Sequence, residues 1–409
     1  MSDVGGERFH ALDAVRGGAL ILGVFFHATL AYLPGPQLWV AVDASRSAEL
    51  SVLFYVLHIF RMTVFFLLAG FFARLLLEKR GVRNFIANRA KRIAAPLAMF
   101  WPISIASIVA VAIWAAVQAN GGAMPEGPPP PPPTAENVPL THLWFLYVLL
   151  WFYACALALR GVVYLIDRGG WLRGRVVDPL MRLVGGPAAP AVLAVPVAAA
   201  LYFTPAWYMW FGIPTPDYGL VPHTTALAVY GLAFGFGWLL NRQPQLLDSW
   251  GKYWLVYLGL GAGATIGCLT IGGVTPVLTP AEQNLTTLVY AASYGFAVWA
   301  WTFAIVGGAV RLFSRESRMR RYIADASYWI YLVHVPIVMA LHALLAPYAW
   351  PWFAKYPLVL AVAFALMLSS YHWLVRYSFI GAILNGKRER PARRANRAPQ
   401  LAAADRRRA

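Results

Sequence analysis

The sequence carries little charge for its length. Asp, Glu, Lys and Arg make up only 12% of the 409 residues, whereas 60% are hydrophobic. A soluble globular domain carries about 25% charged residues, so this chain has too few charges to cover a water-exposed surface. The composition therefore excludes an ordinary soluble domain and predicts that much of the surface contacts lipid.

Cysteine is equally scarce. Only Cys155 and Cys268 occur, both inside apolar runs and without the spacing of a disulfide framework or a metal site. We interpret both as small buried residues and expect no bound metal. A secretory signal peptide is also not expected, because Asp3 and Glu7 precede the first apolar run and no small-residue cleavage site follows it.

Long apolar runs dominate what is present. A membrane-spanning helix needs about 20 mostly apolar residues. The sequence predicts an all-α polytopic membrane bundle of about ten transmembrane helices, at 13–33, 50–77, 93–118, 142–165, 188–206, 222–241, 253–273, 285–311, 326–346 and 356–378.

The basic residues predict the orientation of these spans. Thirty of the 34 Lys and Arg residues fall in the segments on one side of the predicted membrane, and only Arg46 and Lys355 fall on the other, with Arg61 and Arg74 inside the second span. Cytoplasmic loops are enriched in Lys and Arg. The pattern predicts a multi-pass protein of the cell inner (plasma) membrane with both termini in the cytoplasm, and it does not favour a nucleic-acid partner.

Two segments are expected to lie outside the bundle. Residues 119–141 form an outer loop containing Pro128 to Pro133, a run typical of an extended polyproline II spacer. Residues 385–409 form a basic cytoplasmic tail that we expect to be disordered.

Ionisable side chains within membrane spans are costly and are therefore candidate site residues. On the first span, Arg16 and His27 are eleven positions apart, which places them on one helix face about 16 Å apart along the axis. Asp13 lies one turn before Arg16 and can orient it. His27 is either a functional group or a buried neutral imidazole bonded to a backbone carbonyl.

The second span carries His58 and Arg61 on one face. An unpaired Arg at this depth costs about 3 kcal/mol or more. It must therefore meet a carboxylate, for which Asp13, Asp43 and Glu49 are nearest in sequence, or an anionic ligand, which we favour.

The third span begins with Arg89 and Arg92, one turn apart. A helix N-terminus favours anions, so the pair is either a phosphate clamp or an ordinary positive-inside anchor.

Several motifs, in this order, resemble those of the membrane acyltransferase-3 family. They are Leu12–Gly17 followed by His27, Phe65–Phe71, Arg89-x-x-Arg92-Ile93 with Pro96, His142–Leu146 and Ser327–Pro336. The segment His58–Phe66 is most similar to the branch of glucan succinyltransferases, and the resemblance spans an acyltransferase-3 domain over about 8–380. One departure is Ala69, where the family often has Ser, so the role of that hydroxyl is either lost or filled by Thr63.

The resemblance implies transfer of a succinyl or acetyl group from cytoplasmic acyl-CoA to a hydroxyl of a periplasmic or cell-surface glycan. Its implied catalytic residues are His27, as general base or acyl carrier, with Asp13 and Arg16, and Arg61 with His58 at the oxyanion or at a succinyl carboxylate.

The implied donor site and supporting residues complete this set. Arg89 and Arg92 would hold the coenzyme A phosphates. Supporting roles are assigned to His142, Trp144, Tyr331 and His334, although for the two histidines a core or interfacial position is the preferred interpretation. For the aromatic residues, including Trp39, an interfacial belt is the preferred interpretation over sugar stacking.

A transporter or exporter of a sugar or lipid-linked substrate is the alternative, but the internal repeats typical of that class are not evident. No Gly-x-Ser-x-Gly motif favours a serine hydrolase. The residues leave the oligomeric state open.

Overall fold

The computed structural model describes residues 4–124, 132, 134–313, 315 and 317–385, with side chains described from His10 onward. Within them, the fold is all-helical, which confirms the predicted class. An isolated antiparallel bridge joins Pro139 to Tyr218, and the described residues contain no strand. The α-helices are α1 (Val4–Thr29), α2 (Ala48–Arg89), α3 (Ala95–Ala119), α4 (Trp144–Ile166), α5 (Asp178–Val184), α6 (Ala189–Tyr202), α7 (Thr224–Leu240), α8 (Leu246–Gly272), α9 (Leu285–Leu312), α10 (Arg318–Leu345), α11 (Trp352–Ser370) and α12 (Phe379–Asn385).

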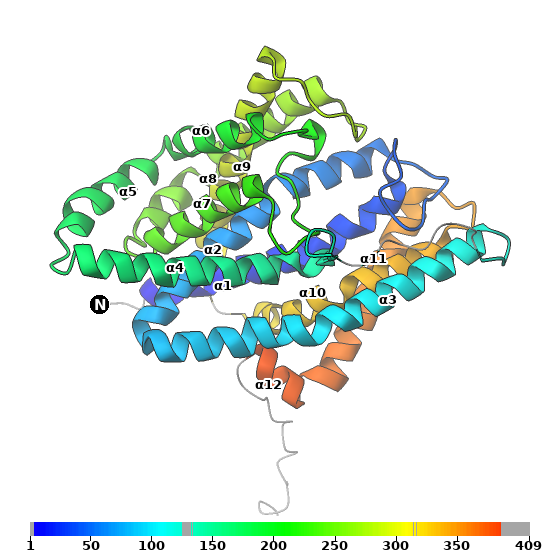
Figure 1. The fold of residues 1–409 in the computed structure, drawn as a ribbon, viewed down its shortest axis with the longest axis horizontal. Helices are drawn as coiled ribbons and strands as arrows, with labels where there is room; N and C mark the ends of the chain where they lie inside the picture. The colour runs from blue at the N-terminus through cyan, green and yellow to red at the C-terminus, as the bar shows by residue number, and fades with distance from the viewer. Residues whose placement is uncertain (1–3, 125–131, 133, 314, 316, 386–409) are drawn as a thin grey trace, which may run out of the picture.

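The helices identify a multi-pass membrane protein. Seven helical stretches of the described residues are long and apolar enough to cross a membrane. The longest, Ala48–Ala119, contains two of the predicted spans, because the chain turns at Gly81 (φ 73°) and runs back as α3 (Figure 1). Only glycine adopts this φ without strain. A bent pair, Arg173–Val184 with Ala189–Tyr202, is an eighth candidate span, and α7 is a shorter apolar helix.

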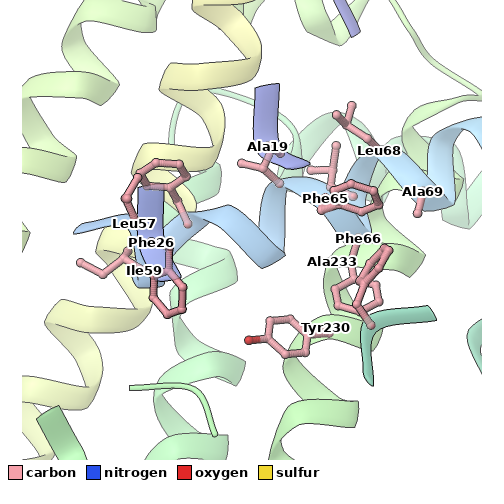
Figure 2. Close-up of a cluster of buried hydrophobic side chains, with 14 of the residues drawn as sticks. Ala19, Phe26, Leu57, Ile59, Phe65, Phe66, Leu68, Ala69, Tyr230 and Ala233 are labelled. Atoms are coloured by element: carbon pink, nitrogen blue, oxygen red, sulfur yellow. The ribbon is translucent and has the colours of Figure 1, made fainter. Parts of the chain in front are cut away.

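Helix packing joins segments that are far apart in the sequence. α1 packs on α10, α2 packs on α7, and α9 packs on both α6 and α8. The α2–α7 contact is unusually close, since a Cβ atom at Gly70 would lie 1.9 Å from the Phe234 carbonyl oxygen. Beside it, the rings of Phe66 and Tyr230 stack with centroids 4.9 Å apart (Figure 2).

The two cysteines differ in their exposure. Cys268 is buried as expected, but Cys155 is exposed on α4, so that prediction was wrong. An apolar run does not distinguish a lipid-facing position from a core position, because lipid and core are equally apolar. Most of the polyproline run and of the basic tail lies outside the described residues.

A buried ion pair fastens the segment after α1 to the start of α11. The Lys355 ammonium lies 2.5 Å from an Asp43 carboxylate oxygen, and the two side chains are only 1% and 4% exposed. Next to it, the Ser45 hydroxyl accepts a hydrogen bond from the Trp352 amide at 2.8 Å. The sequence placed Lys355 among outer-loop charges, but the fold makes it an internal anchor.

We expect Lys355→Met to lower the free energy of unfolding by about 3–5 kcal/mol, because the Asp43 carboxylate is left buried without its cation. Thermal unfolding of the detergent-purified protein measures this loss. Adding Asp43→Asn to the same chain removes the unpaired charge and should recover most of the stability. A single variant as stable as the wild type would show that the pair does not anchor the segment.

Candidate functional site

The centre of the bundle holds a hydrogen bond between two histidines. His27 Nδ1 on α1 lies 3.0 Å from His334 Nε2 on α10 and 2.9 Å from the Gly23 carbonyl oxygen. His334 Nδ1 lies 2.7 Å from the Tyr331 carbonyl oxygen. The sequence alternative of an imidazole bonded to a carbonyl is thus present, but the same nitrogen also meets a second histidine.

These contacts fix the tautomer that each ring adopts in its neutral form. A carbonyl oxygen only accepts hydrogen bonds, so His334 carries its proton on Nδ1 and offers the Nε2 lone pair to His27. His27 Nδ1–H donates to that lone pair and to the Gly23 carbonyl. The Nε2 lone pair of His27 has no hydrogen-bond partner among the described residues and is not enclosed, because His27 is only partly buried. The arrangement leaves an available basic nitrogen inside the bundle.

Pro336 explains how a third histidine joins this cluster. Proline has no N–H, so the carbonyl four positions earlier, that of Leu332, is released from the helix ladder. His142 Nε2 donates to that carbonyl at 3.3 Å, while the Tyr331 hydroxyl donates to the His142 carbonyl at 2.8 Å. The His142 and His334 ring centroids are 5.1 Å apart. The start of α4 is thereby fixed to the middle of α10.

Arg61 approaches the histidines from α2. Its guanidinium lies over the Phe26 ring, 4.4 Å from the centroid, and within electrostatic reach of His27 and His334. Among the described residues it has no carboxylate partner, and its buried Nε atom has no hydrogen bond.

The carboxylates considered from the sequence as partners for Arg61 are engaged elsewhere. Asp13 pairs with Arg16, Asp43 pairs with Lys355, and Glu49 accepts from the Ser47 hydroxyl. These three carboxylates therefore do not neutralise Arg61, and an anionic ligand at Arg61 stays a prediction.

His58 and Trp39 complete the surroundings. His58 stacks on Phe54 at 5.9 Å, and its Nδ1 lies 3.4 Å from the Tyr294 hydroxyl. Trp39 stacks on His27 with centroids 6.0 Å apart, and its Nε1–H donates to His342 Nδ1 at 2.9 Å. Sequence reasoning did not identify His342, because no local motif links it to Trp39.

The interpretation of Trp144 and Tyr331 as an interfacial belt was wrong. Trp144 is only 6% exposed and Tyr331 only 7%. Trp144 stacks on Tyr230, with ring centroids 5.7 Å apart, and Tyr331 lies beside His142 at 5.7 Å. An aromatic residue near a predicted span end fits a belt and a core equally well by sequence, and only the tertiary fold separates the two.

A second cluster lies at the other end of α1. Arg16 lies 3.1 Å from the Asp13 carboxylate and over the Phe72 ring at 5.4 Å. Asp13 and Arg16 therefore share the helix of His27 but not its immediate surroundings. Arg92 lies within electrostatic reach of Arg16 and Arg89, so the three arginines form one basic region.

The two predicted clamp residues already have protein partners. Arg89 donates to the Tyr153 hydroxyl at 3.1 Å, and Arg92 donates to the Leu384 carbonyl at 2.7 Å. Pro96 releases the Arg92 carbonyl, which accepts from the Tyr328 hydroxyl at 2.7 Å. The local π-helix Ala90–Ala94 is a form frequent at functional sites.

Two further features bear on the chemistry. Thr63 is fully buried and its hydroxyl has no partner, but it lies six positions before Ala69 and so points to a different face of α2. Among the described residues, no group of three or more His, Cys, Asp or Glu side chains is arranged to hold a metal ion.

Comparison with known proteins identifies the family. The family model described as an acyltransferase domain matches residues 9–372. The chain belongs to the acyltransferase-3 family. It is therefore an acyltransferase, as the motifs predicted, and the histidine cluster, Arg61 and the basic region all lie within the matched residues.

Curated relatives match over a shorter region. Glucans biosynthesis protein C of Escherichia coli SMS-3-5 is 28% identical over 153 residues, which cover 36% of this chain and 38% of that protein. The same protein of Escherichia coli K12 is 27% identical over the same shares. The chain thus matches well under half the length of these relatives. No solved structure matches it significantly.

The close approach of Arg61 to α1 requires Gly23. A Cβ atom at this position would lie 2.9 Å from an Arg61 guanidinium nitrogen and 3.8 Å from His334 Nε2. We expect Gly23→Ala to displace the guanidinium and to lower the rate of acyl transfer in isolated membranes by about 10²-fold, since small misplacements have effects of this size.

Gly18→Ala on the same helix is the matched control, because a Cβ atom there meets nothing within 4 Å. Both variants should reach the membrane in wild-type amounts. Wild-type turnover by Gly23→Ala would mean that the position of Arg61 does not matter for the reaction.

Proposed function

We propose that this protein is an inner-membrane O-acyltransferase that moves a succinyl or acetyl group from cytoplasmic acyl-CoA to a hydroxyl of a periplasmic or cell-surface glycan. The proposal includes ten transmembrane helices with both termini in the cytoplasm, because each of the ten apolar ranges is largely helical and the basic residues alternate as described. The name of the curated relatives supports a glucan as the acceptor.

The single observation that carries the proposal is the His27 ring, with Nδ1 held and Nε2 available. General acid–base catalysis needs a nitrogen of this kind within reach of the reacting hydroxyl. His334 holds the required tautomer, and Tyr331 and His142 hold His334 in place. Trp144, two residues after His142, stacks on Tyr230 of α7.

In the proposed reaction, His27 Nε2 takes the proton of the acceptor hydroxyl, and the hydroxyl oxygen attacks the carbonyl carbon of the thioester. Arg61, with His58 nearby, stabilises the negative charge on the tetrahedral intermediate. The carbon–sulfur bond then breaks, the ester stays on the glycan, and the coenzyme A thiolate recovers the proton from His27. Because Arg61 has no carboxylate partner among the described residues, it also suits the free carboxylate of a succinyl group.

The donor enters from the end of α1 that carries Asp13 and Arg16. Arg92 lies within electrostatic reach of both Arg16 and Arg89, and the three guanidinium groups suit the diphosphate of coenzyme A. The distance of about 16 Å from Arg16 to His27 along the helix separates the phosphates from the reacting carbonyl. The acceptor approaches from the segment containing Trp39, which lies on His27.

The test is acyl transfer by the purified, reconstituted protein, with labelled succinyl-CoA or acetyl-CoA and isolated periplasmic glucan. We expect label on the glucan and one free thiol for each ester formed. An exporter, the competing function, would move glycan without consuming thioester.

In the same assay, His27→Ala should lower turnover by about 10²–10⁴-fold, because the proton acceptor is lost. His372→Ala, a histidine that packs on Tyr322 rather than on His334, is the control and should retain activity. Near-normal turnover by a correctly inserted His27→Ala protein would remove His27 from the chemistry. Acyl label that remains on the wild-type protein without acceptor would contradict the general-base role and indicate an acyl carrier.

A further inference from the structure

A polar cavity lies where the start of α10 meets α1. Its volume is about 300 Å³, and its lining includes Asp13 and Arg16 from α1 and Ser317, Arg320 and Arg321 from the start of α10. Gly17 packs one turn further along, where a Cβ atom would lie 3.0 Å from the Ala324 Cα. The backbones of α1 and α10 are therefore in close contact beside Ala324, which also lines the cavity.

The charges around the cavity favour an anion. Arg16, Arg315, Arg320 and Arg321 line it with His10, against the carboxylates of Asp13 and Asp325. Four guanidinium groups face two carboxylates, so the lining has an excess of positive charge. α10 is 28 residues long, and its first backbone N–H groups also point toward this end of the helix.

Arg320 is held in place at the cavity. Its guanidinium lies over the Phe313 ring at 5.0 Å from the centroid and donates to the Arg315 carbonyl. The Ser317 hydroxyl caps α10 by accepting from the Arg320 amide at 3.5 Å. A guanidinium bound on one edge still presents other N–H groups to a ligand.

The cavity also lies next to the proposed donor path. Arg16 is shared between the cavity and the basic region of Arg89 and Arg92. The coenzyme A donor carries two separate phosphate groups, a diphosphate and a 3′-phosphate on its ribose. The basic region and the cavity are two adjacent places for these two groups.

We propose that the cavity binds the 3′-phosphate of the acyl-CoA donor, so that Arg320 and Arg321 are donor-binding residues. This inference rests on the proposed acyl-CoA-dependent function. It adds a second phosphate site to the clamp at Arg89 and Arg92, on a helix that no sequence motif connected with the donor.

The experiment compares two donors, the acyl-CoA thioester and its 3′-dephospho analogue. The wild type should have a KM at least tenfold lower for the complete donor, because charge-assisted hydrogen bonds to a phosphate have effects of about ten- to a hundredfold. Arg320→Gln with Arg321→Gln should raise the KM for the complete donor by a similar factor. It should leave kcat and the KM for the dephospho donor nearly unchanged.

Arg311→Gln with Arg318→Gln is the matched control. It removes the same charge from two exposed arginines that do not line the cavity, one in the last turn of α9 and one at the start of α10. It should leave both KM values unchanged. Equal KM values of the wild type for the two donors would overturn the inference, as would equal rises of both KM values in the cavity variant. If the wild type uses neither thioester, the proposed function itself fails, which is a different result.

Discussion

The hydrogen bond between His27 and His334 is the contact on which the rest of the site depends. It joins α1 to α10 at 3.0 Å in the middle of the bundle and places the proton of His27 on Nδ1. Three surrounding contacts act on this pair. Tyr331 orients His334, and Trp39 stacks on His27. Arg61 approaches both rings where Gly23 leaves α1 without a side chain. A change in any of them alters the direction or availability of one lone pair.

The two ends of α1 divide the work of the proposed reaction. One end gathers arginines, where we propose that the phosphate-bearing donor binds. The other end gathers two imidazoles and Arg61, which has no carboxylate partner among the described residues, and there we propose that charge develops during transfer. Interactions between charges are stronger away from water. A guanidinium inside the bundle, such as that of Arg61, therefore stabilises a negative charge more than the same group would at the surface. In this proposal a single helix, α1, carries both a donor-binding arginine and the general base.

Much of this arrangement is predictable from the sequence. Helix existence follows from long apolar runs, and the placement of Arg16 and His27 on one face follows from helical periodicity. The partner of His27 is not predictable in this way, because His334 is 307 positions away and the two meet only through the packing of α1 on α10. The same limit applies to Lys355, Trp144 and Cys155, where an apolar context cannot distinguish core, lipid and loop. Pro336 is a partial exception, since a proline within a helix signals a released carbonyl, here the one that binds His142.

The most direct test of the account is the tautomer of His27 in the folded protein. Nitrogen NMR of histidine-labelled protein in bilayers, with His27→Gln to assign the signal, reports which ring nitrogen carries the proton. We predict a neutral ring protonated at Nδ1 and bare at Nε2, with a coupling or chemical shift that changes when His334 is replaced. A His27 ring protonated at Nε2 and bare at Nδ1 would contradict the account.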